Sequence, residues 1–273
     1  MATVSANLSR PQAAPKAIAI SPGRMFRTSL GIIAILVAWE LLHLYVVNPL
    51  LLPSPFKVVK TLFALLQSGE LIDDIAASMR RILVGYSMGC AVGIGLGLLM
   101  ARSIWVNDLL SPILEVLRPL SPVAMLPLVL IWFGIDEFAK YFLVSYTAAI
   151  IVLLNTAAGV AAMPIIRERA AACLGANERQ IYLHVILPST IPHIITGMRT
   201  ALGFSFMAIV AAELIAAENG IGYLIMQSRM LIQVDQTFAG LLTLSALGAL
   251  SDVVFRLTLS RYGRRYQQEI FNV

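Results

Sequence analysis

Long uninterrupted runs of apolar residues, separated by short polar segments, dominate the pattern along this 273-residue chain. A membrane-spanning helix needs about 20 apolar residues, and six runs approach that length. They cover residues 29–47, 82–101, 119–134, 138–160, 191–217 and 238–259. Because the runs are continuous and do not alternate with polar residues, they predict helices and not the strands of a membrane barrel. The pattern therefore predicts an all-α membrane protein with six transmembrane helices, of which the third is short and rich in proline.

Two further features refine this pattern around the second span. Residues 58–66 are amphipathic, which predicts a helix lying along the membrane interface between the first two spans. Gly85, Gly89 and Gly93 then recur every fourth residue, so that they share one face of the second span. Small residues in such a row allow two helices to approach closely. We expect this row to pack within the chain, with a dimer or gating contact as the alternative.

The fourth and fifth spans are separated by a polar segment, residues 164–188, that predicts an elbow of two helices. It contains Arg169-Ala-Ala-Ala-Cys-Leu-Gly175 and, ten residues later, Val185-Ile-Leu-Pro188. Gly175 suits the left-handed conformation that ends a helix. Asn177 can cap the next helix, with Gln180 three residues on as in a capping box. Such an elbow on the face of a membrane protein has the shape to fit a groove of another protein.

Charge indicates how the chain crosses the membrane. Charged residues make up only 13% of the chain and apolar residues 59%, while the net charge is +5. With both termini inside, thirteen of the 20 Lys and Arg residues fall on the cytoplasmic side, as the positive-inside rule requires. We therefore expect a cytoplasmic elbow. We attribute the positive net charge to the membrane topology and not to binding of nucleic acid. The predicted division is a mobile cytoplasmic tail over 1–28, a membrane domain over 29–260 and a cytoplasmic tail over 261–273.

Polar residues inside the spans are candidates for a transport path. Glu213 lies in the fifth span, where a carboxylate is costly and has to face protein or water. It is either a structural ion-pair partner near the outer interface or part of a path or gate. Asn155 and Ser205 are candidates for the lining of a weakly polar path, although polar residues are also ordinary constituents of membrane helices.

Catalytic chemistry has little support in the sequence. The chain has no phosphate-binding loop, no His-Glu-x-x-His and only three histidines, and its two cysteines suggest free thiols. We predict no catalytic, cofactor or metal site, so any ATP and Mg²⁺ would be bound by a partner subunit.

The elbow resembles the cytoplasmic coupling loop of bacterial ABC importer permeases, whose pattern is Glu-Ala-Ala, three residues, Gly, nine residues, Ile-x-Leu-Pro. Here Arg169 replaces the Glu and Val185 the Ile, so the role of that carboxylate does not carry over. The resemblance extends over about residues 30–260. Segments 51–55, 117–135, 185–192, 197–199, 210–213 and 220–224 are similar to the nitrate, sulfonate and taurine branch.

The resemblance implies a type I importer permease in the bacterial inner membrane, carrying a small anion from periplasm to cytoplasm. It implies as partners a second copy of the chain, two ATP-binding subunits and a periplasmic or lipid-anchored binding protein. The residues that it places at the ATPase contact are Arg169, Ala170, Ala171, Gly175, Ala176, Leu187 and Pro188. Docking would then depend on the shape of the elbow, with an acidic residue of the ATPase opposite Arg169.

Within the branch, residues 132–140 and 220–223 are most similar to aliphatic-sulfonate and taurine permeases. Nitrate, bicarbonate or another small substrate is the alternative, because the binding protein sets much of the selectivity. A secondary transporter driven by an ion gradient is a more distant alternative. Inverted repeats and midplane ion ligands are typical of that class, and neither is evident here.

Overall fold

The computed structural model describes residues 22–45, 48 and 51–262, and the chain divides into two units, Met1–Pro55 and Phe56–Val273. In the first unit, helix α1 (Pro22–Tyr45) begins inside the segment predicted as a tail. Its Trp39 indole donates to the carbonyl oxygen of Pro53 at 3.1 Å, and His43 Nδ1 lies 2.6 Å from the carbonyl oxygen of Leu52. The predicted tail residues 1–21 and 263–273 lie outside the described residues.

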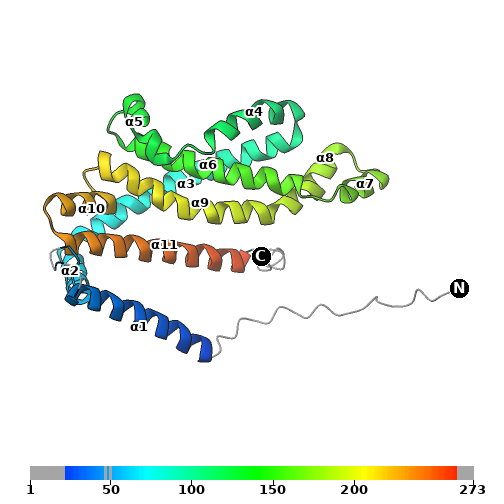
Figure 1. Cartoon of the computed structure of the whole chain (residues 1–273). Coiled ribbons are helices and arrows are strands. Elements are labelled where there is room, and N and C mark those ends of the chain that lie inside the picture. Colours follow the sequence, from blue (N-terminus) through cyan, green and yellow to red (C-terminus); the bar gives the residue numbers. More distant parts are fainter. Residues whose placement is uncertain (1–21, 46–47, 49–50, 263–273) are drawn as a thin grey trace. The chain divides into compact units, whose positions relative to one another are not determined.

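The described part of the second unit is entirely helical (Figure 1). Its elements in chain order are α2 (Pro55–Ser68), α3 (Glu70–Arg102), α4 (Ile104–Leu117), α5 (Pro122–Phe133), α6 (Glu137–Ala161), α7 (Ile165–Cys173), α8 (Glu178–Ile181), the π-helical turn η1 (Tyr182–Ile186), α9 (Leu187–Ala216), α10 (Ile221–Met230) and α11 (Val234–Tyr262). The amphipathic segment after the first span is helical as predicted and buries Val58 and Leu65.

The described residues contain fewer apolar helices of spanning length than the six predicted spans. Four helical stretches of the described chain are long and apolar enough to cross a membrane: Glu70–Arg102, Glu137–Ala161, Glu178–Ala216 and Val234–Leu259. The predicted third span, 119–134, is not a straight helix of spanning length. It contains the short helix α5, which joins α4 at a bend of 104°, and this pair provides a fifth crossing if it counts as one span. Proline accounts for the break, because it lacks the donor that continues a helix. The apolar stretch Ile33–Tyr45 is shorter than a span.

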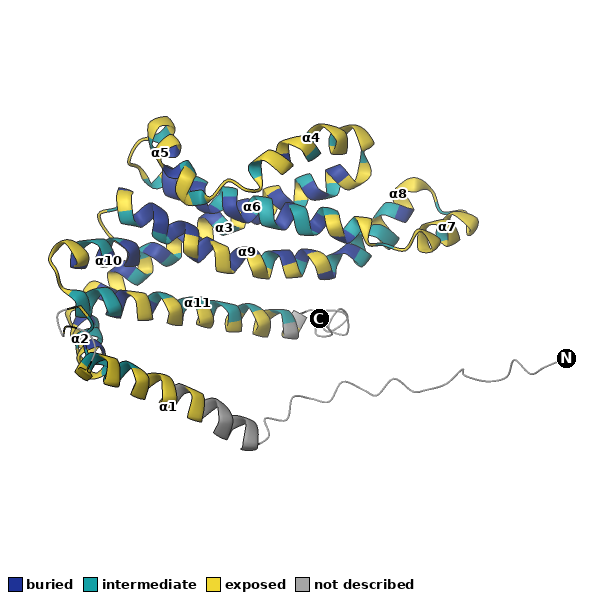
Figure 2. Ribbon diagram, viewed as in Figure 1, coloured by how far each residue is buried: buried dark blue, intermediate teal, exposed yellow. Residues whose placement is uncertain are grey.

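Helices α3, α6 and α9 form the centre of the second unit, where Figure 2 shows most of the buried residues. The glycine row packs within the chain, as we expected. A Cβ added at Gly89 would lie 2.5 Å from the carbonyl oxygen of Ser145, and one at Gly93 would lie 2.6 Å from that of Ala149. The row therefore lets the backbones of α3 and α6 approach closely. Val144, Ile82 and Ile209 fill the adjoining core.

Candidate functional site

The predicted elbow is present at one end of the second unit, where α7 and α8 extend beyond the ends of α6 and α9 (Figure 1). α7 has no buried residue, and Figure 2 shows the elbow as mostly exposed. α8, η1 and α9 follow one another without a break, so that one helical stretch runs from Glu178 to Ala216. The elbow is therefore a projecting structure that continues directly into a long central helix.

Two local motifs fix the turn of the elbow. Gly175 has φ of +84°, and the amide of Ala176 donates to the carbonyl oxygen of Ala171 at 3.1 Å. The amide of Gly175 donates to the carbonyl oxygen of Ala172 at 2.9 Å, which completes a Schellman motif. Asn177 and Gln180 then form the predicted capping box, with both hydrogen bonds at 2.9 Å. Both ends of the turn are thus hydrogen-bonded by neighbouring residues.

The predicted ATPase contacts differ in exposure. Arg169, Ala170 and Gly175 are exposed, whereas Ala171, Ala176, Leu187 and Pro188 are partly buried. Sequence reasoning missed the most exposed apolar side chain of the elbow, Leu174, which keeps 88% of its surface accessible. Single exposed apolar residues are common on protein surfaces, so Leu174 is a candidate contact because of its place on the elbow. Its signal in the sequence was its position directly before Gly175.

A π-helical turn connects the elbow to the central helices. Pro188 has no amide hydrogen for the carbonyl of His184, and the wider turn η1 directly precedes it, with the amide of Leu187 donating to the carbonyl of Tyr182. The Tyr182 hydroxyl donates to the carbonyl oxygen of Leu98 in α3 at 3.2 Å. The Arg102 guanidinium lies 5.5 Å from the centre of the Tyr182 ring. The base of the elbow is therefore anchored to the end of α3.

Glu213 lies at the other end of α9, in a group of polar and charged side chains that we call the charge cluster, formed by Asp74, Ser78, Arg81, Glu137, Lys140 and Glu213. All of them are buried except Glu137, which is partly exposed. Arg81 has 1% of its side chain exposed and donates to Glu213 at 2.8 Å and to Glu137 at 2.6 Å. Lys140 also contacts Glu137 at 2.8 Å. The cluster thus joins α3, α6 and α9.

The charge cluster also holds the turn between α9 and α10. Arg81 donates to the carbonyl and side-chain oxygens of Asn219 at 2.8 and 2.6 Å. The amide of Gly220 donates to Asp74 at 2.7 Å, and the amide of Gly222 donates to Glu213 at 2.9 Å. Of the two interpretations of Glu213, the structure provides the partners of the first, a structural ion pair.

The other two pathway candidates form hydrogen bonds within their own helices. Asn155 is half-buried and donates to the carbonyl oxygen of Ile151 at 2.8 Å, while its side chain lies against Gly197 of α9. Ser205 is fully buried and donates to the carbonyl oxygen of Ala201 at 2.8 Å. The structure does not bring Asn155, Ser205 and Glu213 together into one site.

Comparison with known proteins gives a consistent result. Residues 93–264 match a family described as binding-protein-dependent transport system inner membrane component. The chain is 35% identical over 240 residues to the taurine transport system permease protein TauC of Escherichia coli. The alignment covers 85% of this chain and 87% of the relative. It is 33% identical over 254 residues to a putative aliphatic sulfonates transport permease protein of Bacillus subtilis, covering 91% of this chain and 92% of that one. A nitrate import permease of Leptolyngbya laminosa is 40% identical over 152 residues, covering 56% and 54%.

The fold is also similar to solved structures. An inward-facing form of the MetNI methionine ABC transporter aligns with a TM-score of 0.62 and 17% identity, covering 73% of this chain and 97% of the matched chain. At that identity the likeness concerns the fold alone.

Proposed function

Because the chain belongs to the family of binding-protein-dependent transport system inner membrane components, we propose that it imports a small aliphatic sulfonate or taurine. It is an ABC importer permease subunit, a membrane component and not a catalytic one. The substrate class is supported by long alignments with the taurine and aliphatic sulfonate relatives. Nitrate is a second candidate substrate because of the nitrate import permease among the relatives. Bicarbonate is a further candidate substrate of the same kind.

The observation that carries the proposed mechanism is the projecting elbow, residues 164–188, at the head of the continuous helix Glu178–Ala216. We propose that it sits in a cleft of an ATP-binding subunit, and that the working importer contains two copies of this chain and two such subunits. ATP and Mg²⁺ are bound by those subunits, and a periplasmic or lipid-anchored binding protein delivers the substrate. Both termini and the elbow are cytoplasmic in this arrangement, in agreement with the positive-inside rule.

In this mechanism the elbow is a two-state element that is biased by a ligand of its partner. Closure of the ATP-bound subunits moves the two elbows together. Because η1 and α9 continue from α8 without a break, this movement is passed to the central helices and opens the path outward. Hydrolysis restores the inward-facing state.

Reconstitution tests this proposal. We expect proteoliposomes that contain the chain, its ATPase and its binding protein to import radiolabelled taurine or an alkanesulfonate only when ATP is supplied. The matched control is the purified chain without its ATPase, which we expect to hydrolyse no ATP. Hydrolysis by the chain alone would overturn the division of labour between subunits. Import of nitrate with no import of sulfonates would favour the second candidate.

A further inference from the structure

Helix α4 carries a stripe of polar side chains that the mechanism above does not use. At about 100° per residue, the stripe covers a little over a quarter of the helix circumference. It comprises Asn107, Asp108, Ser111, Glu115 and Arg118, and Ile104 at the start of the helix is an apolar residue at the same angle. Ser111 Oγ donates to Asn107 Oδ1 at 3.4 Å, which agrees with a shared face. Four of the five residues are exposed and Ser111 is partly buried.

The two sides flanking this stripe differ from each other. On one side, Leu114 packs with Met100 and Leu153 against α3 and α6. On the other, Trp105 and Val116 are 88% and 69% exposed, as expected for side chains that face lipid or another subunit. The polar stripe therefore lies between a face packed on this chain and an apolar face left open by it.

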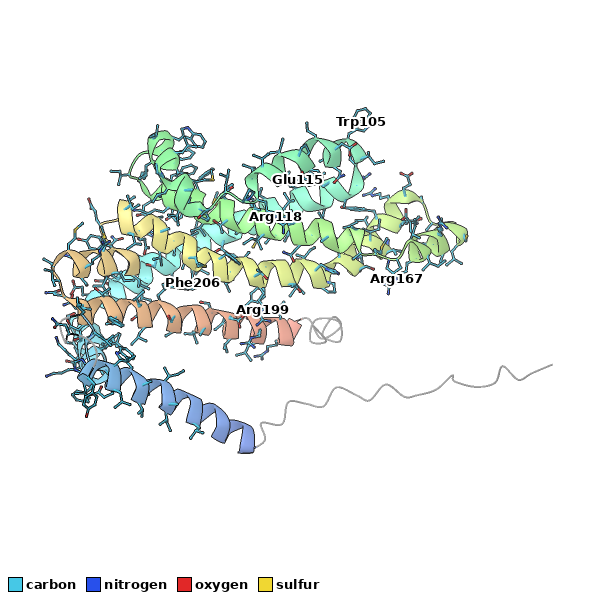
Figure 3. The ribbon with its side chains drawn as sticks, in the orientation of Figure 1. Trp105, Glu115, Arg118, Arg167, Arg199 and Phe206 are labelled. Carbon is cyan, nitrogen blue, oxygen red and sulfur yellow. The ribbon has the colours of Figure 1, made fainter. Side chains whose placement is uncertain are left out.

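The Arg118 end of the stripe lies level with the middle of α6, although its side chains are exposed. The Tyr146 hydroxyl of α6 donates to the carbonyl oxygen of Leu117 at 3.1 Å, directly beside Arg118. Tyr146 is nine residues from the first residue of α6 and fifteen from the last, or about 14 and 23 Å at 1.5 Å per residue. Arg118, at the end of α4, therefore lies level with the middle of α6, a helix that is long and apolar enough to span a membrane. In Figure 3, Arg118 and Glu115 lie about halfway between the elbow end of the bundle and the end at α10.

An ionised side chain at this depth has to face protein or water and not lipid. Among the residues that the structure describes, neither Arg118 nor Glu115 forms an ion pair or a side-chain hydrogen bond. Residues three apart on a helix are neighbours, with Cβ atoms about 5–6 Å from each other. A cation and an anion are thus held side by side at mid-depth, each with free bonding capacity.

We propose that Arg118 and Glu115 form a substrate site for a zwitterionic aminosulfonate such as taurine, an assignment that rests on the proposed import of sulfonates. The Arg118 guanidinium binds the sulfonate, for which its planar array of donors is suited. The Glu115 carboxylate accepts from the substrate ammonium. The remaining stripe, from Ser111 to Asn107, lines the water-filled half of the path that leads away from the site.

This chemistry separates the candidate substrates. Nitrate and simple alkanesulfonates carry only negative charge, so Glu115 would repel them and would gain no partner. A zwitterion matches both charges and leaves neither unpaired in a region of low dielectric constant. The competing explanation is an ion pair between Glu115 of one copy and Arg118 of a second copy.

Uptake by charge variants tests the site in proteoliposomes that contain the complete importer. We expect Glu115→Gln to reduce taurine uptake about tenfold or more, the cost of losing a charged hydrogen bond. Ethanesulfonate uptake should stay equal or rise, because Gln removes the charge that repels it. Arg118→Gln should reduce uptake of both, and the control Glu70→Gln, an exposed carboxylate at the start of α3, of neither. Equal losses of taurine and ethanesulfonate uptake in Glu115→Gln would overturn the assignment. Full recovery of uptake of both substrates in the double variant Glu115→Arg with Arg118→Glu would also overturn it, in favour of the ion pair. If the wild type imports ethanesulfonate but not taurine, the proposed function survives and this site does not; if it imports neither, both fail.

Thiol labelling provides a second measurement that needs only one imported substrate. In a Cys173→Ser background, Ser111→Cys should react with a membrane-impermeant thiol reagent much faster than Leu109→Cys, which lies on the apolar face. Millimolar taurine, added without binding protein, should slow this reaction, and it should lose that effect when Glu115→Gln is present. Equal labelling of the two positions, or a rate that taurine does not change, would contradict the proposal.

Discussion

Arg81 is nearly inaccessible to solvent and yet retains a full set of partners. Its five hydrogen bonds, two to Glu137, one to Glu213 and two to Asn219, match the five N–H donors of a guanidinium. A buried charge is tolerated only when it is paired and hydrogen-bonded. Arg81 therefore determines how α3, α6 and the turn after α9 meet.

Replacing Arg81 with Met should destabilise the protein by about 3–5 kcal/mol, because Glu213 would remain buried without its counter-charge. Thermal unfolding of the purified protein in detergent measures this change. The neighbouring Arg80 is a matched control, since it is 62% exposed and reaches Glu137 only at 3.6 Å. Arg80→Met should cost about 1 kcal/mol or less. Similar losses in the two variants would show that the charge cluster does not depend on Arg81.

The sequence indicated Glu213 as a candidate site residue but did not indicate its ion-pair partner, Arg81. Glu213 was conspicuous because it is a carboxylate within an apolar run. Arg81 lies one residue before the predicted second span, 82–101, whereas α3 already begins at Glu70. The two residues are 132 positions apart, and no local pattern links residues at such a separation.

Single helices and turns were predictable where their causes are local. The Schellman turn and the capping box depend on residues within six positions of one another, and the structure contains both. The glycine row was predictable from its spacing. The bend between α4 and α5 was not, because proline indicates that a helix is broken but packing determines the angle.

Packing of α3 against α6 can be tested at Gly89. Gly89→Leu should destabilise the protein by about 1–3 kcal/mol or more, because even a Cβ would lie within 2.5 Å of the backbone oxygen of Ser145. Gly95→Leu is the control, since an added Cβ there meets no atom within 4 Å. Midpoints of thermal unfolding for the two variants give the comparison. A Gly95 variant as unstable as the Gly89 variant would mean that close packing against α6 does not set the cost, since Leu favours a helix more than Gly does.

Coupling through the elbow can be tested at Gly175. Gly175→Val should strain the turn, because a β-branched residue strongly disfavours φ of +84°. We expect uptake and the ATPase activity stimulated by the binding protein to fall severalfold while the amount of protein in the membrane is unchanged. Gly95→Val again controls for the loss of a glycine. Normal uptake by the Gly175 variant would argue against a coupling role for the turn.

The helical stretch Glu178–Ala216 connects the elbow to the charge cluster within the second unit. It is 39 residues long, about 58 Å at 1.5 Å per residue, which exceeds the bilayer's hydrocarbon core of about 30 Å. Glu213 and the charge cluster lie near one end, and the elbow lies at the other. A helix of this length can reach a soluble partner with one end while the other is held by buried ion pairs. If the elbow docks on the ATPase as proposed, the charge cluster lies on the opposite side of the membrane.

The two native cysteines allow this orientation to be tested without new labels. Cys173 is exposed in the elbow and Cys90 is buried in α3. A membrane-impermeant maleimide should therefore modify Cys173 in inverted membrane vesicles and spare it in intact spheroplasts, while Cys90 stays unmodified in both. Cys173→Ser should abolish the signal, which identifies the reacting thiol. Adding the ATPase subunit to inverted vesicles stripped of it should slow the reaction, because the docked partner would cover the elbow. Labelling of Cys173 from the outside of spheroplasts would reverse the topology and place the elbow beyond reach of any cytoplasmic ATPase.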